Sequence, residues 1–502
     1  MLMHVRLRYM MRALVPPLAA LAVLVTGPLV TPASAHSAGT ITDFPLPTAN
    51  AAPLFAVPGA DGNMWFTENA ASKIGRSTPD GDITEFATPD PNVGPAAIAA
   101  LPDGNIYFSQ DTQSVGRIST AGVFGNIPIP LSNDKPSWLT GGPDGNVWYS
   151  AFPNPDIVRM TPAGDFSVFP IPSTSHASGL APGPDGNLWF GETEADLIGR
   201  ITIDGTITEF ATPTGVRAFG IAPSLDGNMW FTAQSTNQIG RITPNGTITM
   251  FDVPTANSGA AAIATGPDGN MWFTEMSANK IARVLRDGTI NEYDIPTPSS
   301  QPAGIGTGSD GRLWFVEMAG NNLARVSTGA PWNVNPADPA TDEQATIVRT
   351  PFVRPLVVTV LDPDGTPLAG QSITFTAPGA GPSGTFPDGS TTTTTITDAN
   401  GIATSPTLTA NDTVGNYIAT ASADFAKINA NFSLTNNPAA VADTPAAAAA
   451  TPAATLPATG SAGTTVFALL GAALVLTGTG AVRCSRRQVP FLRHLSGSHP
   501  DK

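Results

Sequence analysis

The chain has 502 residues, among them 50 glycines and 49 prolines, and only 13% of its residues are charged. A chain of this length is too long to fold around a single hydrophobic core, so several domains are expected. The composition favours turn-rich β domains over a helical protein. The formal net charge of −15 repels phosphate backbones, which argues against nucleic acid as a partner.

The N-terminus has the features of an export signal in their usual order. Three arginines precede an apolar stretch over residues 13–30, and Ala33-Ser34-Ala35 supplies a small-x-small cleavage site. We therefore expect residues 1–35 to be a signal peptide that is cut between Ala35 and His36. An N-terminal membrane anchor is the alternative, and the cleavage triplet argues against it.

One short stretch, DGNMWFTE at residues 61–68, returns along the chain with small changes. The seven copies start at residues 61, 103, 144, 185, 226, 268 and 310. A fixed period of 41 or 42 residues with several short strands in each unit predicts a β-propeller rather than a helical solenoid.

A single repeat divides into four predicted strands, as the copy around residue 268 illustrates. The strands cover residues 261–265, 271–275, 280–285 and 289–294. Tight turns of the types Asp-Gly-Asn and Asp-Gly separate them, and residues of alternating polarity fit strands throughout.

The seventh copy lacks its fourth strand, and the missing piece stands at the other end of the repeat region. Residues 39–44, GTITDF, match residues 205–210, GTITEF. We therefore expect the N-terminal strand to complete the seventh blade and close the ring, which removes exposed sheet edges. An arginine recurs in the third strand of each repeat, and we expect it to bond to the backbone or to carboxylates of the neighbouring blade.

The wording DGNMWFTE…KIGR…DGTITEF resembles the streptogramin (virginiamycin B) lyase family of seven-bladed propellers, over roughly residues 39–328. The resemblance implies elimination at an ester of a cyclic depsipeptide with help from Mg²⁺. It also implies a histidine in each of the last two inner strands and a glutamate just before the last of them. Those positions hold Ala261, Ala303 and Gln301 here, and only the glutamate after the final WF strand persists, as Glu317. Alanine cannot transfer a proton, so lyase activity is not expected.

Two positions of the repeat vary while the scaffold does not, and both should lie at the mouth of the central channel. Nine residues before each repeat Asp stand Ala52, Gly94, Lys135, His176, Arg217, Gly259 and Gln301. Seven residues after it stand Glu68, Gln110, Ala151, Glu192, Ala233, Glu275 and Glu317.

These positions form two predicted arcs of opposite charge. Lys135, His176 and Arg217 lie on consecutive blades, and so do Glu275, Glu317 and Glu68. With Gln301 they are the candidate ligand-binding residues, for a zwitterionic or glycan-like ligand. The alternative is that the glutamates cap turns or pair with the repeated arginines.

Chemistry at the mouth has few other candidates. His176 is a lone possible base, but it fits a polar rim contact better, and Glu317 is the other weak catalytic candidate. Glu68, Glu275 and Glu317 could hold Mg²⁺ or Ca²⁺, since both ions prefer oxygen ligands.

After the repeats, residues 331–437 lose the period and show short strands of alternating character. We expect strands at 357–361, 372–377, 391–397, 401–409 and 417–422 in a β-sandwich. The text DPDGTPLAGQSITF…GNYIATA resembles the bacterial Ig-like domains of invasin-type adhesins. Such modules commonly act as spacers, and binding through this one is the alternative.

The last part of the chain reads as a linker followed by a sorting signal. Residues 438–455, rich in Ala, Pro and Thr, should be an extended linker. LPATG at 456–460, an apolar run over 464–482 and a basic cluster resemble the cell-wall sorting signal of Gram-positive surface proteins, over residues 456–502. The resemblance implies that sortase cuts between Thr459 and Gly460 and attaches the chain to peptidoglycan. A plain transmembrane anchor is the alternative.

Together these features predict an all-β, wall-anchored surface protein. Residues 39–330 are expected to form a seven-bladed propeller that binds or adheres to an extracellular protein, glycan or small molecule. The chain is expected to contact the membrane only through its C-terminal segment, before sorting. The alternative function is a divergent lyase-like enzyme, a C–O lyase or hydrolase, that acts at the channel mouth. A purely structural component of the wall is the third possibility.

Overall fold

The computed structural model describes residues 38–130 and 134–440, and its regular structure there consists of strands and two short 3-10 helices. The predicted signal peptide and the sorting signal lie outside these residues. Among the described residues, no helix is long and apolar enough to cross a membrane.

Seven four-stranded antiparallel sheets follow one another along residues 41–326. Blade one contains β2 (Pro53–Pro58), β3 (Met64–Glu68), β4 (Lys73–Ser77) and β5 (Ile83–Ala87). Blade two contains β6 (Ile98–Ala100), β7 (Asn105–Ser109), β8 (Ser114–Ser119) and β9 (Phe124–Pro128). Blade three contains β10 (Lys135–Gly141), β11 (Val147–Phe152), β12 (Asp156–Met160) and β13 (Phe166–Pro170).

The remaining blades repeat this order. Blade four contains β14 (Ala177–Pro182), β15 (Leu188–Glu192), β16 (Leu197–Ile201) and β17 (Ile207–Ala211). Blade five contains β18 (Ile221–Pro223), β19 (Met229–Ala233), the 3-10 turn η1 (Gln234–Thr236), β20 (Gln238–Ile242) and β21 (Ile248–Asp252). Blade six contains β22 (Ala260–Thr265), β23 (Met271–Glu275), β24 (Lys280–Val284) and β25 (Ile290–Asp294). The predicted four-strand unit is confirmed within one residue at each boundary.

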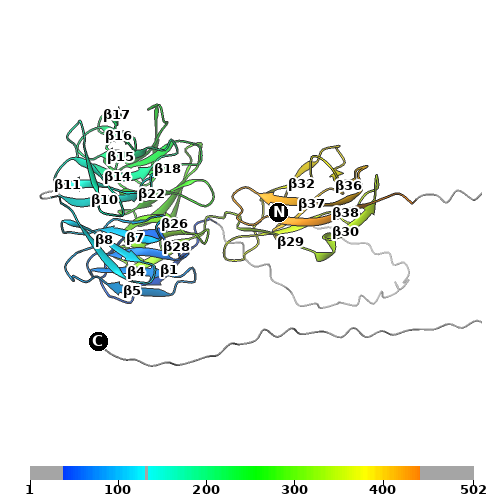
Figure 1. Cartoon of the computed structure of the whole chain (residues 1–502), viewed down its shortest axis with the longest axis horizontal. Coiled ribbons are helices and arrows are strands. Elements are labelled where there is room, and N and C mark those ends of the chain that lie inside the picture. Colours follow the sequence, from blue (N-terminus) through cyan, green and yellow to red (C-terminus); the bar gives the residue numbers. More distant parts are fainter. Residues whose placement is uncertain (1–37, 131–133, 441–502) are drawn as a thin grey trace, which may run out of the picture. The chain divides into compact units, whose positions relative to one another are not determined.

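The seventh sheet joins the two ends of the repeat region. It contains β26 (Pro302–Thr307), β27 (Leu313–Glu317), β28 (Asn322–Val326) and, as its outer strand, β1 (Ile41–Pro45). Strand β1 pairs antiparallel with β28 (Figure 1), and the phenyl ring of Phe44 lies 5.5 Å from Trp314. The predicted closure by the N-terminal strand is therefore confirmed.

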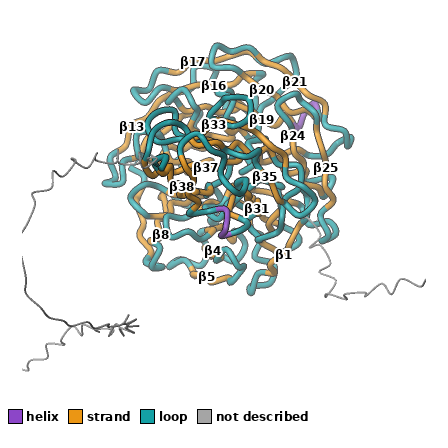
Figure 2. Tube along the Cα trace, turned by 90° about the vertical axis from the view of Figure 1, so that its right-hand side faces the viewer, coloured by secondary structure: helices purple, strands orange, loops and turns teal. Residues whose placement is uncertain are grey.

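The inner strands of successive blades touch one another, and β26 touches β2, so the blades form a closed ring. The fourth strands, among them β5, β17 and β25, lie along its periphery (Figure 2). In the closed ring each blade is covered by a neighbouring blade on both faces. The second strands, such as β3, are therefore buried along their whole length.

The repeated arginine ties neighbouring blades together. Arg200 lies over the rings of Trp189 and Phe210, 5.4 and 5.3 Å from their centroids. Its Nη1 donates to the carbonyl of Pro244, 2.9 Å away in the turn of the next blade. Arg76, Arg159 and Arg325 make the same kind of bond to the next blade, so an inter-blade role is confirmed for these arginines.

The DGN turn is built for the tryptophan beside it. Gly62 has φ +83°, a conformation that side chains disfavour, and the Asp61 carboxylate accepts from Trp65 Nε1 at 3.1 Å. A Cβ on Gly59 would stand 2.5 Å from the indole ring, so this position needs glycine for close packing.

Residues 333–437 form two further sheets and a two-stranded ribbon around a separate core. One sheet has the order β29 (Asn333–Pro336), β31 (Val357–Leu361), β35 (Ile402–Thr404). The other has the order β30 (Gln344–Ile347), β38 (Ala430–Asn437), β37 (Gly415–Ala423), β32 (Ser372–Thr376), β34 (Thr392–Ile396), with the 3-10 turn η2 (Pro339–Thr341) before it. The ribbon pairs β33 (Gly384–Thr385) with β36 (Thr409–Ala410). We call this part the C-terminal β-domain.

Sequence patterning missed β29, β30, β33 and β38 in this domain, and the strand predicted over 401–409 is in fact the two short strands β35 and β36. The largest omission is β38. Its residues, ANFSLTNN, contain three asparagines, which strands usually avoid, yet the burial alternates along it. The strand lies between β30 and β37, and these two partners satisfy its backbone. The Ig-like assignment of the domain stays a prediction.

Candidate functional site

The two variable positions of the repeat lie at one edge of the ring, as expected. The amide after the second strand donates to the carbonyl of the residue that opens the inner strand. This bond joins Asn69 to Ala52 at 3.2 Å, Thr193 to His176 at 3.0 Å and Met318 to Gln301 at 3.1 Å. We call this edge the channel mouth.

The predicted cationic arc has its side chains at the mouth surface. Lys135 and Arg217 are exposed and His176 is half-buried. Lys135 Nζ pairs with Asp111 at 2.7 Å, and His176 Nδ1 lies 3.1 Å from a carboxylate oxygen of Glu194. Arg217 makes no ion pair with any residue that the structure describes, so its charge is available to a ligand.

Gln301 also lies at the mouth, and it has an exposed side chain and a backbone φ of +52°. Ala52 shares this left-handed backbone at φ +49°, and glycine occupies the same position in blades two and six. A non-glycine residue in this left-handed conformation costs folding free energy, so the surrounding structure must hold the backbone of Ala52 and Gln301 in place.

The predicted acidic arc is wrong as a surface feature. Glu68, Glu275 and Glu317 have 0% of their surface exposed. Side chains alternate along a strand, so Glu68 lies on the same face as Phe66, and the preceding blade covers that face. The carboxylates therefore end inside the blade interfaces and cannot touch a ligand at the mouth.

Each buried glutamate instead faces an acid of its own outer strand. In blade one, Glu85 accepts from Lys73 Nζ at 2.7 Å and from the Thr48 amide at 2.9 Å. Both oxygens of Glu68 lack a hydrogen-bond partner. Burial, and then the charge of Glu85, raise the pKa of Glu68 to about 8. Burial pushes the pKa of Glu85 up as well, but the bonds from Lys73 and Thr48 outweigh it and hold that pKa below its usual range.

Three other blades carry the same kind of acid pair: Glu192 with Glu209, Glu275 with Glu292, and Glu317 with Asp43. Burial is the main cause that raises the pKa of Glu275 to about 8 and those of Glu192 and Glu317 to about 7. Within residues 38–130 and 134–440, no three His, Cys, Asp or Glu side chains come together as metal ligands. A shared site of Glu68, Glu275 and Glu317 for Mg²⁺ or Ca²⁺ is therefore not formed. The glutamates also do not pair with the repeated arginines, which stack on tryptophan instead.

Three aromatic rings meet across the channel. Phe55 and Trp138 pack edge to face with their centroids 5.1 Å apart, and Trp138 and Phe219 do so at 5.4 Å. Phe55 and Trp138 lie in the inner strands of blades one and three, and Phe219 lies just before the inner strand of blade five. These blades are not neighbours in the ring, so the contacts cross its centre. All three rings are only partly buried. We call Phe55, Trp138 and Phe219 the aromatic floor.

The floor lies beside the positions that the resemblance assigns to catalytic histidines. Ala261 and Ala303 are buried, with 3% and 6% exposed. The carbonyl of Ala261 accepts from Thr232 Oγ1 at 2.7 Å, and a Cβ on Gly304 would stand 2.8 Å from the ring of Phe55. Methyl groups and aromatic rings thus replace titratable groups in the channel.

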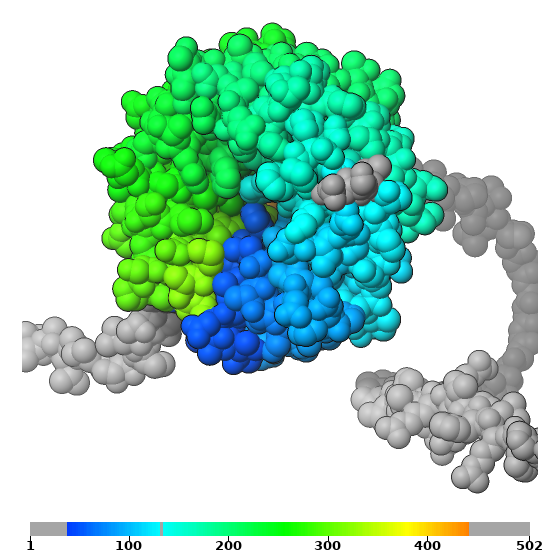
Figure 3. Space-filling view, turned by 90° about the vertical axis from the view of Figure 1, so that its left-hand side faces the viewer, coloured from blue at the N-terminus to red at the C-terminus, as the bar shows by residue number. Residues whose placement is uncertain are grey.

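A cleft of about 340 Å³ lies at the mouth over blade two, with further lining residues from blades one and three. Lys135, Asp111, Ser137 and Phe152 are among its lining residues. Phe152 is 53% exposed, and its ring packs 5.2 Å from His176. Figure 3 shows this face of the propeller, where the blue start of blade one meets the cyan and green blades around a central hollow.

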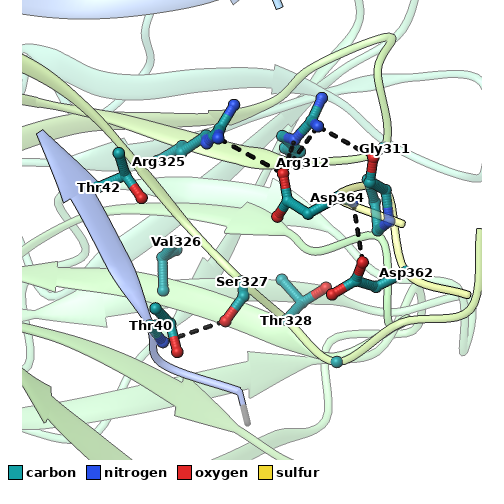
Figure 4. Close-up of a pocket in the computed structure, with 12 residues that line it drawn as sticks. Thr40, Thr42, Gly311, Arg312, Arg325, Val326, Ser327, Thr328, Asp362 and Asp364 are labelled. Carbon is teal, nitrogen blue, oxygen red and sulfur yellow. Dashed lines mark hydrogen bonds and ion pairs between the residues drawn. The ribbon is translucent and has the colours of Figure 1, made fainter. Parts of the chain in front are cut away.

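Sequence reasoning missed a contact at the opposite edge, although the signal was present. The seventh copy reads DGR where all other copies read DGN. Arg312 Nη2 donates to Asp364 at 2.8 Å and to the carbonyl of Pro363 at 3.0 Å, and Arg325 lies 3.4 Å from the same carboxylate (Figure 4). Arg312 keeps a bond within its own turn, from Nη1 to Asp310 at 3.2 Å, and adds these contacts to the C-terminal β-domain.

Comparisons with known proteins agree with this geometry. The model of the virginiamycin B lyase family matches residues 33–217 and 136–336, which together exceed half of the chain. The chain belongs to the virginiamycin B lyase family. An LPXTG cell wall anchor motif matches residues 448–489. The protein is therefore anchored to the cell wall at a Gram-positive surface, through sortase and peptidoglycan.

Solved structures of the family cover the propeller. A streptogramin B lyase structure is 32% identical with a TM-score of 0.55, over 57% of this chain and 97% of that one. Virginiamycin B lyase from Staphylococcus aureus is 33% identical with a TM-score of 0.54, over 57% of this chain and 99% of that one. A catalytically inactive histidine-to-alanine form of that enzyme, with quinupristin, has the same figures. No curated protein matches the chain.

Proposed function

We propose that this wall-anchored protein displays its propeller as a binding module, and that the ligand lies over the aromatic floor at the channel mouth. The aromatic floor is the observation that carries the proposal. Three partly exposed rings in a concave site offer a large apolar contact area at low entropic cost. The C-terminal β-domain and the linker serve as spacers between wall and propeller.

The chemistry of the mouth defines the class of ligand. An apolar or CH-rich face would pack on Trp138 and Phe219, and Phe152 extends that surface into the adjacent cleft. Arg217, which has no ion-pair partner among the described residues, would attract an anionic group. Because the glutamates are buried, we expect an anionic ligand rather than the zwitterionic one that two opposite arcs would have oriented.

Binding fits the residues better than lyase chemistry does. An alanine cannot take up or donate a proton, and Ala261 and Ala303 stand where the family's histidines are expected. A histidine-to-alanine form of the Staphylococcus aureus enzyme is catalytically inactive. Glu317 is buried, and His176, which pairs with Glu194, lies on blade four and not at either of the expected histidine positions.

The test uses full-length protein released from the wall by muralytic digestion. It is probed on arrays of glycans and of host and bacterial peptides, and each hit is titrated against Trp138→Ala and Arg217→Ala. We expect at least a tenfold loss of affinity for Trp138→Ala and an unchanged affinity for Lys427→Ala, a variant on the C-terminal β-domain. Hits that survive both mouth substitutions would refute the assignment to the mouth.

The enzymatic alternative is tested with the same preparation. We expect no opening of a streptogramin B ring above the uncatalysed rate. Turnover that is lost in Glu317→Gln would replace the binding proposal with a divergent lyase.

A further inference from the structure

Blade two lacks the buried acid pair that blades one, four, six and seven carry. A pocket of about 470 Å³ opens there, on the side that faces blade one. Its lining includes Phe108, Phe124, Gln110, Ser114 and Asn126. Its lining comes from blade two and from the loop that joins blades one and two, apart from the aromatic floor.

The pocket exists because blade two has short, neutral residues at three equivalent positions. Strand register aligns Gln110 with Glu68, Ser114 with Lys73 and Asn126 with Glu85. In blade one the lysine reaches the outer-strand glutamate at 2.7 Å and fills this space. Blade six has the same residues, Lys280 and Glu292, 3.9 Å apart.

The polar side chains of the pocket bond to one another but keep some hydrogen-bonding atoms unused. Gln110 Nε2 donates to Asn126 Oδ1 at 2.8 Å and to Ser114 Oγ at 3.2 Å, and Thr112 Oγ1 lies 2.8 Å from that hydroxyl. Gln110 Oε1 and Asn126 Nδ2 have no partner among the described residues. Gln110 and Asn126 therefore offer one acceptor and one donor to a ligand, and the hydrogen-bond network holds both side chains in place.

The walls are aromatic. Phe108 and Phe124 pack edge to face with their centroids 6.2 Å apart, and prolines from the adjoining loops complete the lining. Asp90 is the only charged residue among the described residues that line the pocket. An anion finds no cationic partner there, and a metal ion finds a single carboxylate.

We propose that this blade-two pocket binds a neutral, hydroxyl-rich ligand, namely one sugar unit of a glycan. A pyranose presents C–H faces to aromatic walls and hydroxyl edges to amides and hydroxyls, which is the pairing that the pocket provides. Its size falls within the range of small-molecule sites, which span roughly 300–1,000 Å³. This site is independent of the proposed function at the mouth.

The test is ligand-detected NMR on the full-length protein with a panel of neutral sugars: glucose, galactose, mannose, N-acetylglucosamine and N-acetylgalactosamine. The informative variant is Ser114→Lys/Asn126→Glu, which installs the residues of blade one and fills the pocket. We expect saturable binding of at least one sugar, with at least a tenfold loss in this double variant and none in Arg217→Ala at the mouth. Glucuronate is the charged probe and should bind more weakly than glucose.

A second variant protects the test against misfolding. Asn126→Ala removes one amide from an exposed outer-strand position and should weaken binding at least threefold without a change in melting temperature. If no sugar in the panel binds saturably, or if the double variant is folded and binds like the parent, the proposal is wrong. Loss of binding in Arg217→Ala alone would move the sugar site to the mouth.

Discussion

Replacing Glu68 by glutamine is expected to stabilise the propeller, and the gain should grow with pH. In the folded chain the pKa of Glu68 is raised to about 8, and in the unfolded chain it has the model value of 4.5. Between these values the folded protein keeps a proton that the unfolded chain releases. Stability is therefore fully present below pH 4.5 and is lost as pH rises towards 8.

The magnitude follows from the width of that window. One pKa unit corresponds to about 1.4 kcal/mol, so at pH 7 the buried carboxyl costs roughly 3 kcal/mol relative to a neutral group. Glutamine mimics the protonated carboxyl, as Gln110 does at the equivalent position of blade two. The Glu68→Gln variant should gain most of this free energy at pH 7, which raises the melting temperature by roughly 5–10 °C for a domain of this size.

The assay is thermal and urea unfolding of parent and variant at pH 5 and pH 8. The matched control is Glu85→Gln in the same pair. This carboxylate is the ionised partner of Lys73, so its loss should destabilise the protein at pH 8 and matter less as the pH falls. A Glu68→Gln variant whose stability difference from the parent is the same at both pH values, or negative at pH 8, would refute the assignment of a buried proton to Glu68.

Three further outcomes test the architecture. Deletion of residues 39–46 removes β1 and exposes the edge of β28, and it should lower the melting temperature by roughly 10 °C or more; an unchanged transition would contradict ring closure. Arg312→Asn restores the residue of the other copies and breaks the bonds to Asp364, which should cost about 1 kcal/mol. Limited proteolysis between the propeller and the C-terminal β-domain should therefore accelerate about fivefold, while the melting temperature of the propeller stays unchanged. Thr459→Ala should leave the protein in the membrane fraction, and a variant that stays covalently bound to the wall would disprove sorting at LPATG.

The sequence determined the ring because its information is periodic. Each copy carries the turn, the arginine and a large aromatic residue, which is tryptophan in six copies and Tyr107 in the second. The displaced GTITDF strand shows where the ring closes. The same comparison between copies located the mouth, since Lys135, His176, Arg217 and Gln301 vary where the scaffold does not. It also placed alanines at the two expected histidine positions.

Only the tertiary structure decided which way the variable side chains point. Glu68 and Lys135 lie at the same edge of the ring, yet strand alternation directs the first into a blade interface and leaves the second in water. The aromatic floor joins residues from blades that are neither adjacent in sequence nor adjacent in the ring, so no local pattern could predict it. The pocket of blade two arises in the same way, because a serine in place of a half-buried lysine leaves space only where the folded strands and the loop before them surround it.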